Sequence, residues 1–589
     1  MIFTQRTHTC GELRSSHIGQ KITLNGWVEG RRNLGGMIFI DLRDRYGKTQ
    51  IVLEPQYNNE AAEKGKDVRS EYVLSVTGTV RMRPDGMINR SMPTGEIEVI
   101  VDEVEILNTS ELPPFDIKDE VDAFEDLRLK YRYLDLRRRA LQQNLIIRHN
   151  MYQVVHRYFD ALNFIEVETP VLMKSTPEGA RDYLVPSRVH HGKFYALPQS
   201  PQQYKQLLMV AGMDRYVQLV KCFRDEDLRA DRQPEFTQID VEMSFVKQEN
   251  IFEIIEGLIR ELFKEITGWE IAVPFMRLDY ESAIKKFGSD KPDTRFGMEI
   301  VTINESMAQS GFKVFADAVE KGGSVAGINV KQQAGFSRSQ LDALTEKAKA
   351  FGASGLVWMK AKNGKLESPA AKFLSPENIL AIQQEFQSKE GDLILIVADP
   401  NAKKAYTALG SLRLDIAKQV NISYSNDHTL LWITDFPLFQ WDGEEKRFVA
   451  EHHPFTSPHD EDLPYLDSDP AKVRANCYDL VWNGNEVASG SIRIHTSELQ
   501  AKVFSIMGLS DEEVKEKFGF LLNAFKYGAP PHGGIALGFD RMAAIFVGTP
   551  SIRDVIAFPK TNSALSLMDE SPSFASQKQL DELHLAIKK

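Results

Sequence analysis

The first 111 residues of the chain alternate apolar and polar positions in five short runs, and turns that contain glycine separate most of them. The five runs are Lys21–Glu29, Met37–Asp41, Thr49–Leu53, Tyr72–Arg81 and Glu96–Leu107. Successive side chains of a strand point to opposite faces, so alternation is typical of a strand with one buried face. Five such strands at close spacing predict a small closed β-barrel over residues 1–111.

After residue 111 the spacing of apolar residues changes from that of strands to that of helices. A connector with Pro113 and a basic stretch over Arg128–Arg139 predict a hinge over residues 112–139. The apolar stripe of the first long helix consists of Ile147, Met151, Val154, Val155, Tyr158, Phe159 and Leu162. We expect Asn163 to end this helix and a strand over Phe164–Glu168 to follow. Strands and helices alternate from there, which predicts an α+β fold.

The middle of the chain differs from its flanks in the chemistry that it offers. Residues 295–424 show helical and strand patterns but no group of reactive side chains, whereas residues 140–294 and 425–559 contain several. We therefore expect an inserted α/β domain at 295–424 that divides one catalytic domain into two parts. The polar residues 560–589 are expected to form a C-terminal extension. The predicted fold class is α+β and multidomain.

Composition narrows the class of protein without identifying it. The chain has 589 residues, 42% hydrophobic and 26% charged, as is usual for a globular protein of several domains. Its longest strongly apolar run, Leu393–Ala398, is far shorter than the roughly 20 residues that cross a bilayer. Three widely spaced cysteines, Cys10, Cys222 and Cys477, exclude a disulfide framework and the usual cysteine-based zinc sites. With no basic and apolar signal at the N-terminus, we expect a cytoplasmic protein without a membrane partner.

The net charge bears on the kind of partner that the protein binds. A value of −12 argues against a protein that coats nucleic acid, because phosphate binding needs positive potential. Arginine and lysine nevertheless cluster locally, so the charge leaves a specific RNA partner open.

The most informative stretch is Tyr216–Phe245, which we interpret as a long hairpin. On its second strand, one face is largely apolar, and the other face carries Phe236, Gln238, Asp240 and Glu242. Arg224 and Glu226 end the first strand, below a basic loop. A polar strand face often simply faces solvent. An aromatic residue, a basic loop and an acidic floor together instead favour a nucleotide site, in which an aromatic ring and an arginine hold a purine.

A second candidate site lies at Gly533–Arg541, where a strand runs into a helix. Asp540 is expected to be the N-cap of this helix, and Arg541 lies in its first turn. An arginine at the positive end of a helix is unfavourable unless an anion is near. Gly538 permits a ligand to approach the backbone closely. The combination indicates a phosphate site.

A third group surrounds the tight turn predicted at Asn483-Gly484. Asp479 and Glu486 flank the turn and offer the carboxylates that Mg²⁺ prefers. Glu486 and Arg493 have opposite parity, so a regular strand would point them to opposite faces. If both serve one site, a β-bulge must lie between them, and we place it at Ser489–Ser491.

Two smaller features complete the candidates. Thr176–Arg181 is either an ordinary turn or a mobile loop that brings Glu178 over a site. The pair His452-His453 could contact a substrate. Adjacent histidines on an extended chain point apart, so we do not expect this pair to bind a metal.

Together these stretches resemble the three signature motifs of the class II aminoacyl-tRNA synthetases, in the same order. Phe164–Pro170 resembles motif 1, Phe223–Phe236 resembles motif 2, and Gly538–Arg541 resembles motif 3. With its predicted N-terminal oligonucleotide-binding (OB) barrel, the chain resembles one subclass of these synthetases, which contains the aspartyl, asparaginyl and lysyl enzymes. The segments that look like aspartyl enzymes are Thr176–Tyr183, Gln199–Gln202 and Gly288–Asp293. The large insertion resembles the bacterial form, whose catalytic domain is built on an antiparallel sheet.

The resemblance implies roles for particular side chains. The ATP-binding residues would be Arg224, Asp225, Glu226, Gln233, Phe236, Glu486, Gly538, Phe539, Asp540 and Arg541, of which Arg224, Arg541 and Glu486 would be catalytic. The aspartate-binding residues would be Glu178, Ser200, Gln202, Lys205, Arg224, Asp240, His452, His453 and Arg493. Asp479 and Glu486 would hold Mg²⁺. The anticodon-binding residues of the barrel would be Arg32, Phe39, Gln50 and Glu98, with Phe39 stacked on a base.

The reaction implied by the resemblance is the ATP-dependent attachment of L-aspartate to tRNA(Asp) through an aspartyl-adenylate, by a homodimer joined through motif 1. Charging of tRNA(Asn) as well stays open. The alternatives are an asparagine or lysine enzyme, a non-catalytic RNA-binding paralogue and an amide-forming ligase on the same fold. Lysine would need an acidic pocket where Lys205 and Arg493 stand, and a paralogue would be expected to lose residues such as Arg224 and Arg541.

Overall fold

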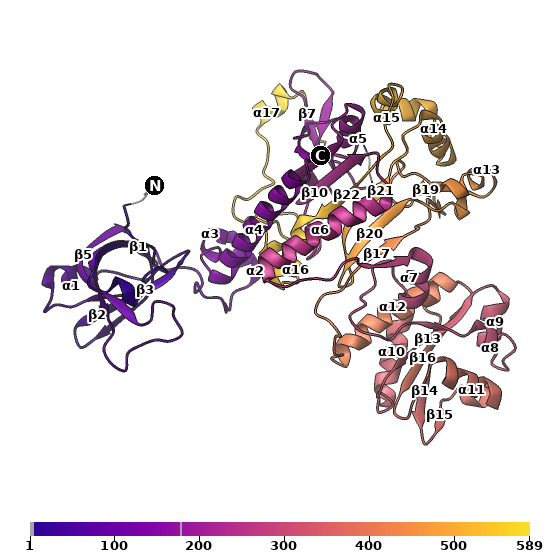
Figure 1. Cartoon of the computed structure of the whole chain (residues 1–589), viewed down its shortest axis with the longest axis horizontal. Helices are drawn as coiled ribbons and strands as arrows, with labels where there is room; N and C mark the ends of the chain where they lie inside the picture. The colour runs from indigo at the N-terminus through magenta and orange to yellow at the C-terminus, as the bar shows by residue number, and fades with distance from the viewer. Residues whose placement is uncertain (1–4, 177–178, 589) are drawn as a thin grey trace. The chain divides into compact units, whose positions relative to one another are not determined.

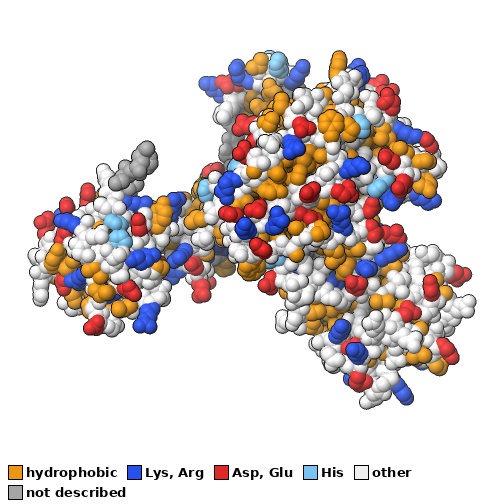
Figure 2. Space-filling view, viewed as in Figure 1, with side chains coloured by type: hydrophobic (Ala, Val, Ile, Leu, Met, Phe, Trp, Pro, Cys, Tyr) orange, Lys and Arg blue, Asp and Glu red, His pale blue; other side chains and the backbone are white. Residues whose placement is uncertain are grey.

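The computed structural model describes residues 5–176 and 179–588, which divide into two compact units (Figure 1). The first unit comprises Met1–Asn150, Asp227–Gln233 and Val547–Ala575. The second comprises Met151–Glu226, Pro234–Phe546 and Ser576–Lys589. On the face displayed in Figure 2, acidic and basic side chains are interspersed rather than gathered into one large field. Within the described residues, no helix combines the length and the apolar content needed to cross a membrane.

The first unit begins with a closed five-stranded barrel, in the order β1-β2-β3-β5-β4. Its strands are β1 (Lys21–Leu34), β2 (Met37–Asp44), β3 (Gly47–Leu53), β4 (Val73–Met82) and β5 (Ile97–Asn108). Alternate residues of β1, such as Leu24 and Val28, are fully buried in the barrel core. The helix α1 (Asn59–Gly65) is capped by Asn58, whose side chain accepts a hydrogen bond from Ala61 N. The barrel predicted from the alternating runs is confirmed.

The remainder of the first unit is held together by buried arginines. Its further elements are η1 (Ser15–His17), α2 (Glu125–Lys130), α3 (Arg132–Asp135) and η5 (Ile552–Asp554). Arg132 pairs with Asp135 at 2.7 Å and donates to the carbonyl oxygens of Arg553, Ile556 and Ala557. The segment around residue 553 is thereby fixed to the helices that follow the barrel.

The second unit is built on an eight-stranded sheet in the order β11-β17-β20-β21-β22-β10-β9-β6. The strands are β6 (Ile165–Glu166), β9 (Arg215–Phe223), β10 (Glu235–Ser244), β11 (Met276–Asp279), β17 (Leu430–Thr434), β20 (Cys477–Trp482), β21 (Asn485–Ile492) and β22 (His532–Gly538). All neighbours are antiparallel except the edge pairs β11·β17 and β6·β9. The strand predicted over Phe164–Glu168 is shorter than expected, because only Ile165 and Glu166 pair with β9.

One face of this sheet is apolar and is covered by α6 (Gln248–Thr267). Phe252 of α6 stacks on Trp432 at 4.2 Å, and Glu256 Oε1 accepts a hydrogen bond from Trp432 Nε1 at 2.9 Å. In the middle of the sheet, a Cβ on Gly490 would lie 2.3 Å from the carbonyl oxygen of Gly534, so no larger residue fits there. The apolar packing on this side leaves the opposite face of the sheet for polar side chains.

Other elements of the second unit surround the sheet (Figure 1). The helix α4 (Arg139–Ala161) begins in the first unit and ends in the second, where Asn163 adopts φ +58° after its last turn. The helices are α5 (Gln202–Val210), α7 (Tyr280–Phe287), α13 (Tyr465–Ser468), α14 (Ser497–Ile506), α15 (Asp511–Phe525), α16 (Phe539–Val547) and α17 (Gln577–Glu582). The short 3-10 turns are η3 (Asp460–Asp462) and η4 (Pro470–Lys472), and the hairpins are β7 (Leu184–Pro186) with β8 (Phe194–Ala196) and β18 (Phe439–Asp442) with β19 (Arg447–Ala450).

A separate five-stranded sheet lies in the middle of the chain, in the order β12-β13-β16-β14-β15. Its strands are β12 (Val301–Thr302), β13 (Ser324–Val330), β14 (Val357–Lys362), β15 (Lys365–Glu367) and β16 (Leu393–Asp399). The helical elements around it are α8 (Asn304–Met307), α9 (Lys313–Glu320), α10 (Arg338–Ala350), α11 (Pro376–Glu385), α12 (Ala402–Gln419) and η2 (Ala371–Phe373). Both faces of β16 are buried, in two separate hydrophobic cores.

The two ends of this middle segment meet. The backbone N–H and the hydroxyl of Ser425 both donate to the carbonyl oxygen of Arg295, at 2.8 and 2.9 Å. Arg413 of α12 is fully buried beside them and donates to the carbonyl oxygens of Asp293, Phe296, Gly297 and Met298 at 2.9 to 3.1 Å. Burial lowers the pKa of Arg413 to about 10, against the raising effect of Asp293.

Arg413→Ala should loosen the segment that connects the two sheets. Removing the guanidinium leaves four carbonyl groups short of a donor, which we expect to cost more than about 3 kcal/mol, since hydrogen bonds to charged groups are worth about 1.5–3 kcal/mol each. Urea unfolding and hydrogen exchange of residues 293–298 measure the effect. Lys403→Ala, an exposed change on the same helix, is the control, and equal behaviour of the two variants would contradict the prediction.

Candidate active site

The polar face of the large sheet carries the candidate site. Along β10, Gln238, Asp240 and Glu242 point to this face, and they are at least nine-tenths buried rather than solvent-facing. The sheet register pairs Asp240 with Ala536 and Glu242 with Gly534 on β22, and Gly534 with Ser491 on β21. The arrangement confirms the predicted alternation of β10. It also shows that its polar face lines a buried acidic floor.

A β-bulge brings Glu486 to the same face. The register of β20 and β21 shifts between the pairs Leu480–Ala488 and Val481–Glu486, so Val487 is the extra residue. The bulge was predicted from the opposite parity of Glu486 and Arg493, and it exists. Its predicted position at Ser489–Ser491 is wrong, because those residues pair regularly with both β20 and β22. The predicted turn at Asn483-Gly484 is confirmed, with positive φ at both residues.

Four charged side chains form the centre of the site. Lys205 of α5 places its Nζ 3.0 Å from Asp240 Oδ1 and 3.1 Å from Glu242 Oε2. Arg493 directs Nε and Nη2 at the two oxygens of Glu242, at 3.0 and 3.2 Å. All four side chains are at most 2% exposed. Two anions and two cations therefore neutralise one another out of contact with water, as buried charges must.

The remaining contacts of Arg493 fix the orientation of its guanidinium. Nη1 donates to His453 Nε2 and to Ser491 Oγ, each at 2.7 Å. With the two bonds to Glu242, four of the five N–H groups of a guanidinium have partners, and the fifth lies on Nη2. A carboxylate that binds both terminal nitrogens must therefore replace one of the Nη1 contacts.

Burial and the neighbouring charges set the protonation of this group. Burial raises the pKa of Asp240 to about 6, although Lys205 acts to lower it. Burial also acts to raise the pKa of Glu242, but Arg493 and Lys205 outweigh it and the pKa is lowered. Burial, together with Arg493, holds the pKa of His453 well below its ordinary value. Neutral His453 can thus accept the hydrogen bond from Arg493 on an unprotonated Nε2.

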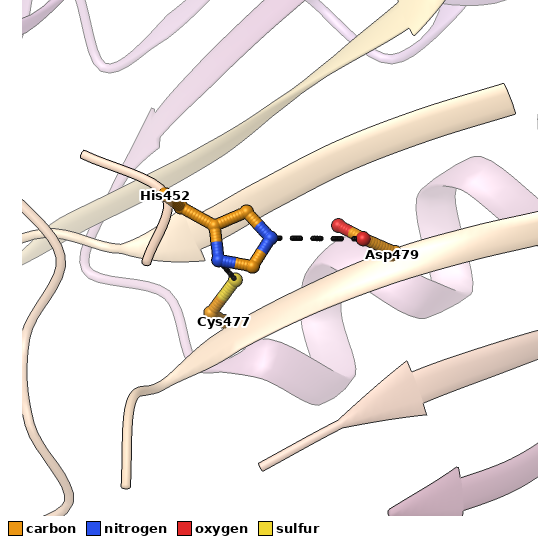
Figure 3. A group of neighbouring side chains, drawn as sticks. All are labelled: His452, Cys477 and Asp479. Atoms are coloured by element: carbon orange, nitrogen blue, oxygen red, sulfur yellow. Dashed lines mark hydrogen bonds and ion pairs between the residues drawn. The ribbon is translucent and has the colours of Figure 1, made fainter. Parts of the chain in front are cut away.

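A second polar group joins the loop residue His452 to Cys477 and Asp479 of the strand β20 (Figure 3). His452 places Nδ1 3.4 Å from Cys477 Sγ and Nε2 3.7 Å from Asp479 Oδ2. Burial acts to lower the pKa of His452, but Cys477 and Asp479 raise it well above its ordinary value. The two adjacent histidines therefore have different partners, because His453 contacts Arg493 instead.

The carboxylates of Asp479 and Glu486 interact electrostatically. Burial and the charge of Asp479 both raise the pKa of Glu486, against the lowering effect of Lys291 and Arg541. Lys291 Nζ lies 3.8 Å from Glu486 Oε2. Asp479 is 3% exposed, and its Oδ1 has no hydrogen-bond partner among the described residues. Two carboxylates that interact electrostatically, one with a buried oxygen that has no partner among the described residues, fit a divalent cation.

The residues expected at the nucleotide surround the ends of β9 and β22. The Arg224 guanidinium lies 5.1 Å from the ring centre of Phe236, and its buried Nε has no partner among the described residues. Arg224 follows the last residue of β9 instead of ending it as predicted. Arg541 of α16 donates from Nη1 to the carbonyl oxygen of Glu486 on β21.

The prediction that Asp540 caps its own helix is wrong. The helix α16 begins at Phe539, so Asp540 is its second residue. Its Oδ2 accepts a hydrogen bond from the backbone N–H of Thr237 at 2.7 Å. This contact satisfies a donor of β10 and ties the start of α16 to the strand that carries the acidic floor.

Several other predicted residues have different surroundings. Asp225 forms an ion pair with Arg181, whose Nε lies 3.6 Å from Asp225 Oδ2. Glu226 is the next residue of the chain after Asp225 and lies outside the strands β9 and β10. Phe539 is fully buried, with its ring centre 4.5 Å from that of Tyr152. Gln233 belongs to the first unit, where it exchanges two hydrogen bonds with the backbone of Lys560.

The last predicted residues around the pocket lie at the start of α5. Ser200 Oγ accepts a hydrogen bond from Gln202 N at 3.3 Å. The side-chain Nε2 of Gln202 is buried and has no partner among the described residues. Glu178 lies outside the described residues.

In the barrel, three of the four residues expected at the RNA form one chain of hydrogen bonds. Arg32 donates to Gln50 Oε1 at 3.1 Å, and Gln50 donates to Glu98 Oε2 at 2.8 Å. The fourth, Phe39, is the cross-strand partner of Arg32 and is half-buried. The four side chains come from four different strands, and Gln50 and Glu98 are buried whereas Arg32 is exposed.

Three side chains of the site were not predicted from the sequence to contact other residues of the site. Glu242 was placed on the polar face but given no role, although its parity with Asp240 was a signal. Ser491 was considered only as part of a bulge. Cys477 gave no signal, since it contacts His452 across 25 residues of sequence.

The fold and the site together define a class of protein. Residues 124–562 match the family described as tRNA synthetases class II (D, K and N), and residues 22–107 match the OB-fold nucleic acid binding domain. The first match covers most of the chain, so the protein belongs to the class II tRNA synthetase family.

Similar proteins extend over nearly the whole length. The chain is 54% identical over 583 residues to the aspartate–tRNA(Asp/Asn) ligase of Caldanaerobacter subterraneus subsp. tengcongensis, covering 99% of this chain and 98% of that protein. It is 53% identical over 586 residues, with the same coverage, to the aspartate–tRNA ligase of Ruminiclostridium cellulolyticum.

Solved structures share the fold at lower identity. The asparaginyl-tRNA synthetase of Pyrococcus horikoshii, complexed with asparaginyl-adenylate, matches with a TM-score of 0.58 and 18% identity over 94% of this chain and 98% of that one. A putative aspartyl-tRNA synthetase of Leishmania major matches with a TM-score of 0.59 and 18% identity over 95% and 94%. These likenesses bear on the fold alone.

Glu242→Gln should destabilise the protein, because Arg493 and Lys205 would lose the carboxylate that they share. The change removes one buried anion and leaves Arg493 and Lys205 to share Asp240, at a cost of about 3–5 kcal/mol, as for other broken buried ion pairs. A lower urea midpoint measures the effect. Glu249→Gln, an exposed change at the start of α6, is the control, and an unchanged midpoint for Glu242→Gln would count against the charge balance described above.

Proposed function

We propose that the protein attaches L-aspartate to tRNA(Asp) with ATP as the energy source. The observation that carries this proposal is the buried Arg493, oriented by Glu242 and accompanied by Lys205, in a chain whose relatives are named aspartate–tRNA ligases. Guanidinium and ammonium groups favour a carboxylate side chain over the amide of asparagine or the ammonium of lysine. A buried polar match of this kind rejects the wrong substrate by about 10⁴-fold or more.

The first step joins aspartate to the nucleotide. The α-carboxylate of aspartate attacks the α-phosphorus of ATP, and the bond to pyrophosphate breaks. Arg224 would stabilise the charge that develops at this phosphate, Phe236 would stack on adenine, and Arg541 would bind the nucleotide from the other side. The free Nε of Arg224 and its position beside Phe236 support these roles.

Around the amino acid, Asp240, Gln202 and Ser200 would receive the ammonium group. Lys205, Arg493 and the two histidines would hold the side-chain carboxylate. Asp479 and Glu486 would hold Mg²⁺, because the unpartnered Asp479 Oδ1 and the raised pKa of Glu486 fit a cation. When bound, Mg²⁺ would neutralise phosphate charge.

The second step transfers the aspartyl group to RNA. The terminal ribose hydroxyl of tRNA attacks the aspartyl carbonyl, and AMP leaves. Residues 1–111 would bind the anticodon, while residues 140–294 and 425–559 would form the catalytic domain, linked by 112–139, interrupted by 295–424 and followed by 560–589. Motif 1 would join two copies as a homodimer, and the exposure of Ile165, Val171 and Leu172 supports an apolar contact there.

A second candidate function is charging of tRNA(Asn) with aspartate. The relatives from Caldanaerobacter subterraneus and Thermoanaerobacter pseudethanolicus are named aspartate–tRNA(Asp/Asn) ligases, whereas that from Ruminiclostridium cellulolyticum is named for aspartate alone. Aminoacylation of purified tRNA(Asp) and tRNA(Asn) distinguishes the two functions.

The activation step is tested by ATP–pyrophosphate exchange with aspartate, asparagine and lysine. We expect exchange with aspartate only, and Arg224→Ala should reduce it by about 10²–10³-fold, as for other contacts to charge in a transition state. Arg188→Ala, an exposed arginine of the same unit, is the control. Exchange that prefers asparagine, or that survives Arg224→Ala, would refute the assignment.

Phe39→Ala should separate RNA binding from amino acid activation. Loss of one stacked base is worth about 1–3 kcal/mol, so kcat/KM for tRNA should fall by about 5- to 150-fold. ATP–pyrophosphate exchange without tRNA should stay at the wild-type rate, because Phe39 lies in the barrel. Tyr57→Ala, an exposed aromatic of the barrel, is the control. Equal aminoacylation by Phe39→Ala and Tyr57→Ala would remove Phe39 from the RNA site.

Aspartate binding should weaken in mildly acidic solution. The pKa of Asp240 is raised to about 6, so its negative charge is present above this pH and is lost as the pH falls through it. The KM for aspartate in the exchange reaction should then rise by up to about tenfold per pH unit below 6, as for one essential ionisation. The KM for ATP serves as the internal control. A KM for aspartate that is flat from pH 7.5 to about 5 would contradict a role for this charge.

A further inference from the structure

His452, Cys477 and Asp479 form a group of three different ligand types in the described part of the chain. Each offers one ligand atom, and these atoms lie within 4.8 Å of one another. Figure 3 shows the imidazole of His452 between the sulfur and the carboxylate. Cys477 and Asp479 are at most 3% exposed, whereas the side chain of His452 is 23% exposed. The group therefore has two buried members, and His452 is the member that solvent reaches.

The spacing between sulfur and nitrogen suits a tetrahedral metal. Zinc bonds of about 2.3 Å to sulfur and about 2.0–2.1 Å to nitrogen place the two ligand atoms about 3.6 Å apart at the tetrahedral angle. The observed distance from Cys477 Sγ to His452 Nδ1 is 3.4 Å. On the far side of the ring, Nε2 faces Asp479 at 3.7 Å, as a carboxylate that orients a metal-bound imidazole does.

A second observation points to a cation at the Asp479 end of this group. Asp479 Oδ1 is buried and has no hydrogen-bond partner among the described residues. A buried carboxylate oxygen without a donor is costly, and a positive ion would remove this cost. Magnesium and a thiophilic ion would compete for this carboxylate, but they differ in the other ligands that they accept. Magnesium prefers oxygen alone, whereas thiolate and imidazole favour ions such as Zn²⁺.

We propose that His452, Cys477 and Asp479 bind a thiophilic divalent cation of the Zn²⁺ class, through Cys477 Sγ and His452 Nδ1, with Asp479 holding the imidazole or completing the coordination. Binding replaces two protons by the metal, that of the Cys477 thiol and that on Nδ1 of the protonated His452 imidazole, and both are released to solvent. Water occupies the remaining positions. The usual sequence signature of a cysteine-based zinc site is absent, because the ligands come from a loop and from β20.

Occupancy of this site has a consequence that rests on the proposed function. The ion would take Asp479 away from Mg²⁺ and His452 away from the amino acid. Micromolar Zn²⁺ or Co²⁺ would then inhibit aspartate activation competitively with Mg²⁺, without any change in the tRNA-binding barrel.

The binding itself is tested with Co²⁺, which reports a thiolate ligand by a sulfur-to-metal charge-transfer absorption. The full chain is titrated with Co²⁺ in the absence of magnesium, ATP, aspartate and RNA. We expect one Co²⁺ per chain with this absorption, also in a Cys10→Ser, Cys222→Ser protein in which Cys477 is the remaining cysteine. Cys477→Ser should lose the absorption, and Asp479→Asn should weaken binding by about 10–100-fold.

The outcomes are separable. Absence of the charge-transfer absorption from the wild-type chain, or its persistence in Cys477→Ser, overturns the site. If Cys477→Ser does not fold, X-ray absorption of zinc bound to the Cys10→Ser, Cys222→Ser protein decides, since a shell without sulfur at about 2.3 Å is then incompatible with the proposal. Because these measurements use no substrate, they remain decisive even if the exchange assay fails to support aspartate activation.

Discussion

The site depends on the mutual neutralisation of four buried charges. Lys205 and Arg493 share Glu242, and Lys205 also binds Asp240, so no member of the group is left without a counter-charge. A charge that is buried alone costs several kcal/mol, and a counter-charge within the same group offsets this cost. The polar face of the sheet can therefore be buried as deeply as its apolar face. A ligand that enters this pocket meets side chains whose orientation is already fixed, and water need not be reorganised around them.

The backbone alternation of the barrel and of β10 was predictable because it is a local property. Each side chain of a strand alternates regardless of what lies opposite, so Gln238, Asp240 and Glu242 fall on one face by parity alone. The bulge near Glu486 was predictable only in part. Parity required one extra residue, but its place is decided by the neighbouring strands. Residues 488–492 pair with β22, which leaves Val487 as the residue that can remain outside the ladder.

What could not be predicted depends on residues distant in sequence. The pairing of Arg493 with Glu242 spans 251 positions, and the contact of Asp540 with Thr237 spans 303. Asp540 has the residue type and position that favour a helix cap, yet its carboxylate accepts a hydrogen bond from the backbone N–H of Thr237 on β10. The contact of His452 with Cys477 likewise needs the loop before Pro454 to fold back over β20. Local rules describe what a side chain can do, and the tertiary fold decides which partner it has.

The hydrogen bonds of Arg413 and Ser425 at the two ends of the middle segment have a consequence for the architecture of the large sheet. Because Ser425 bonds to Arg295, the chain leaves and re-enters the part that contains the large sheet at two residues in direct contact. Residues 296–424 therefore form one long closed connection between two strands of that sheet. When the two ends of a connection are held together in this way, each added residue increases the conformational entropy cost of closing it only slightly. The middle segment can thus change in length without a change in the register of the strands that hold the charged pocket.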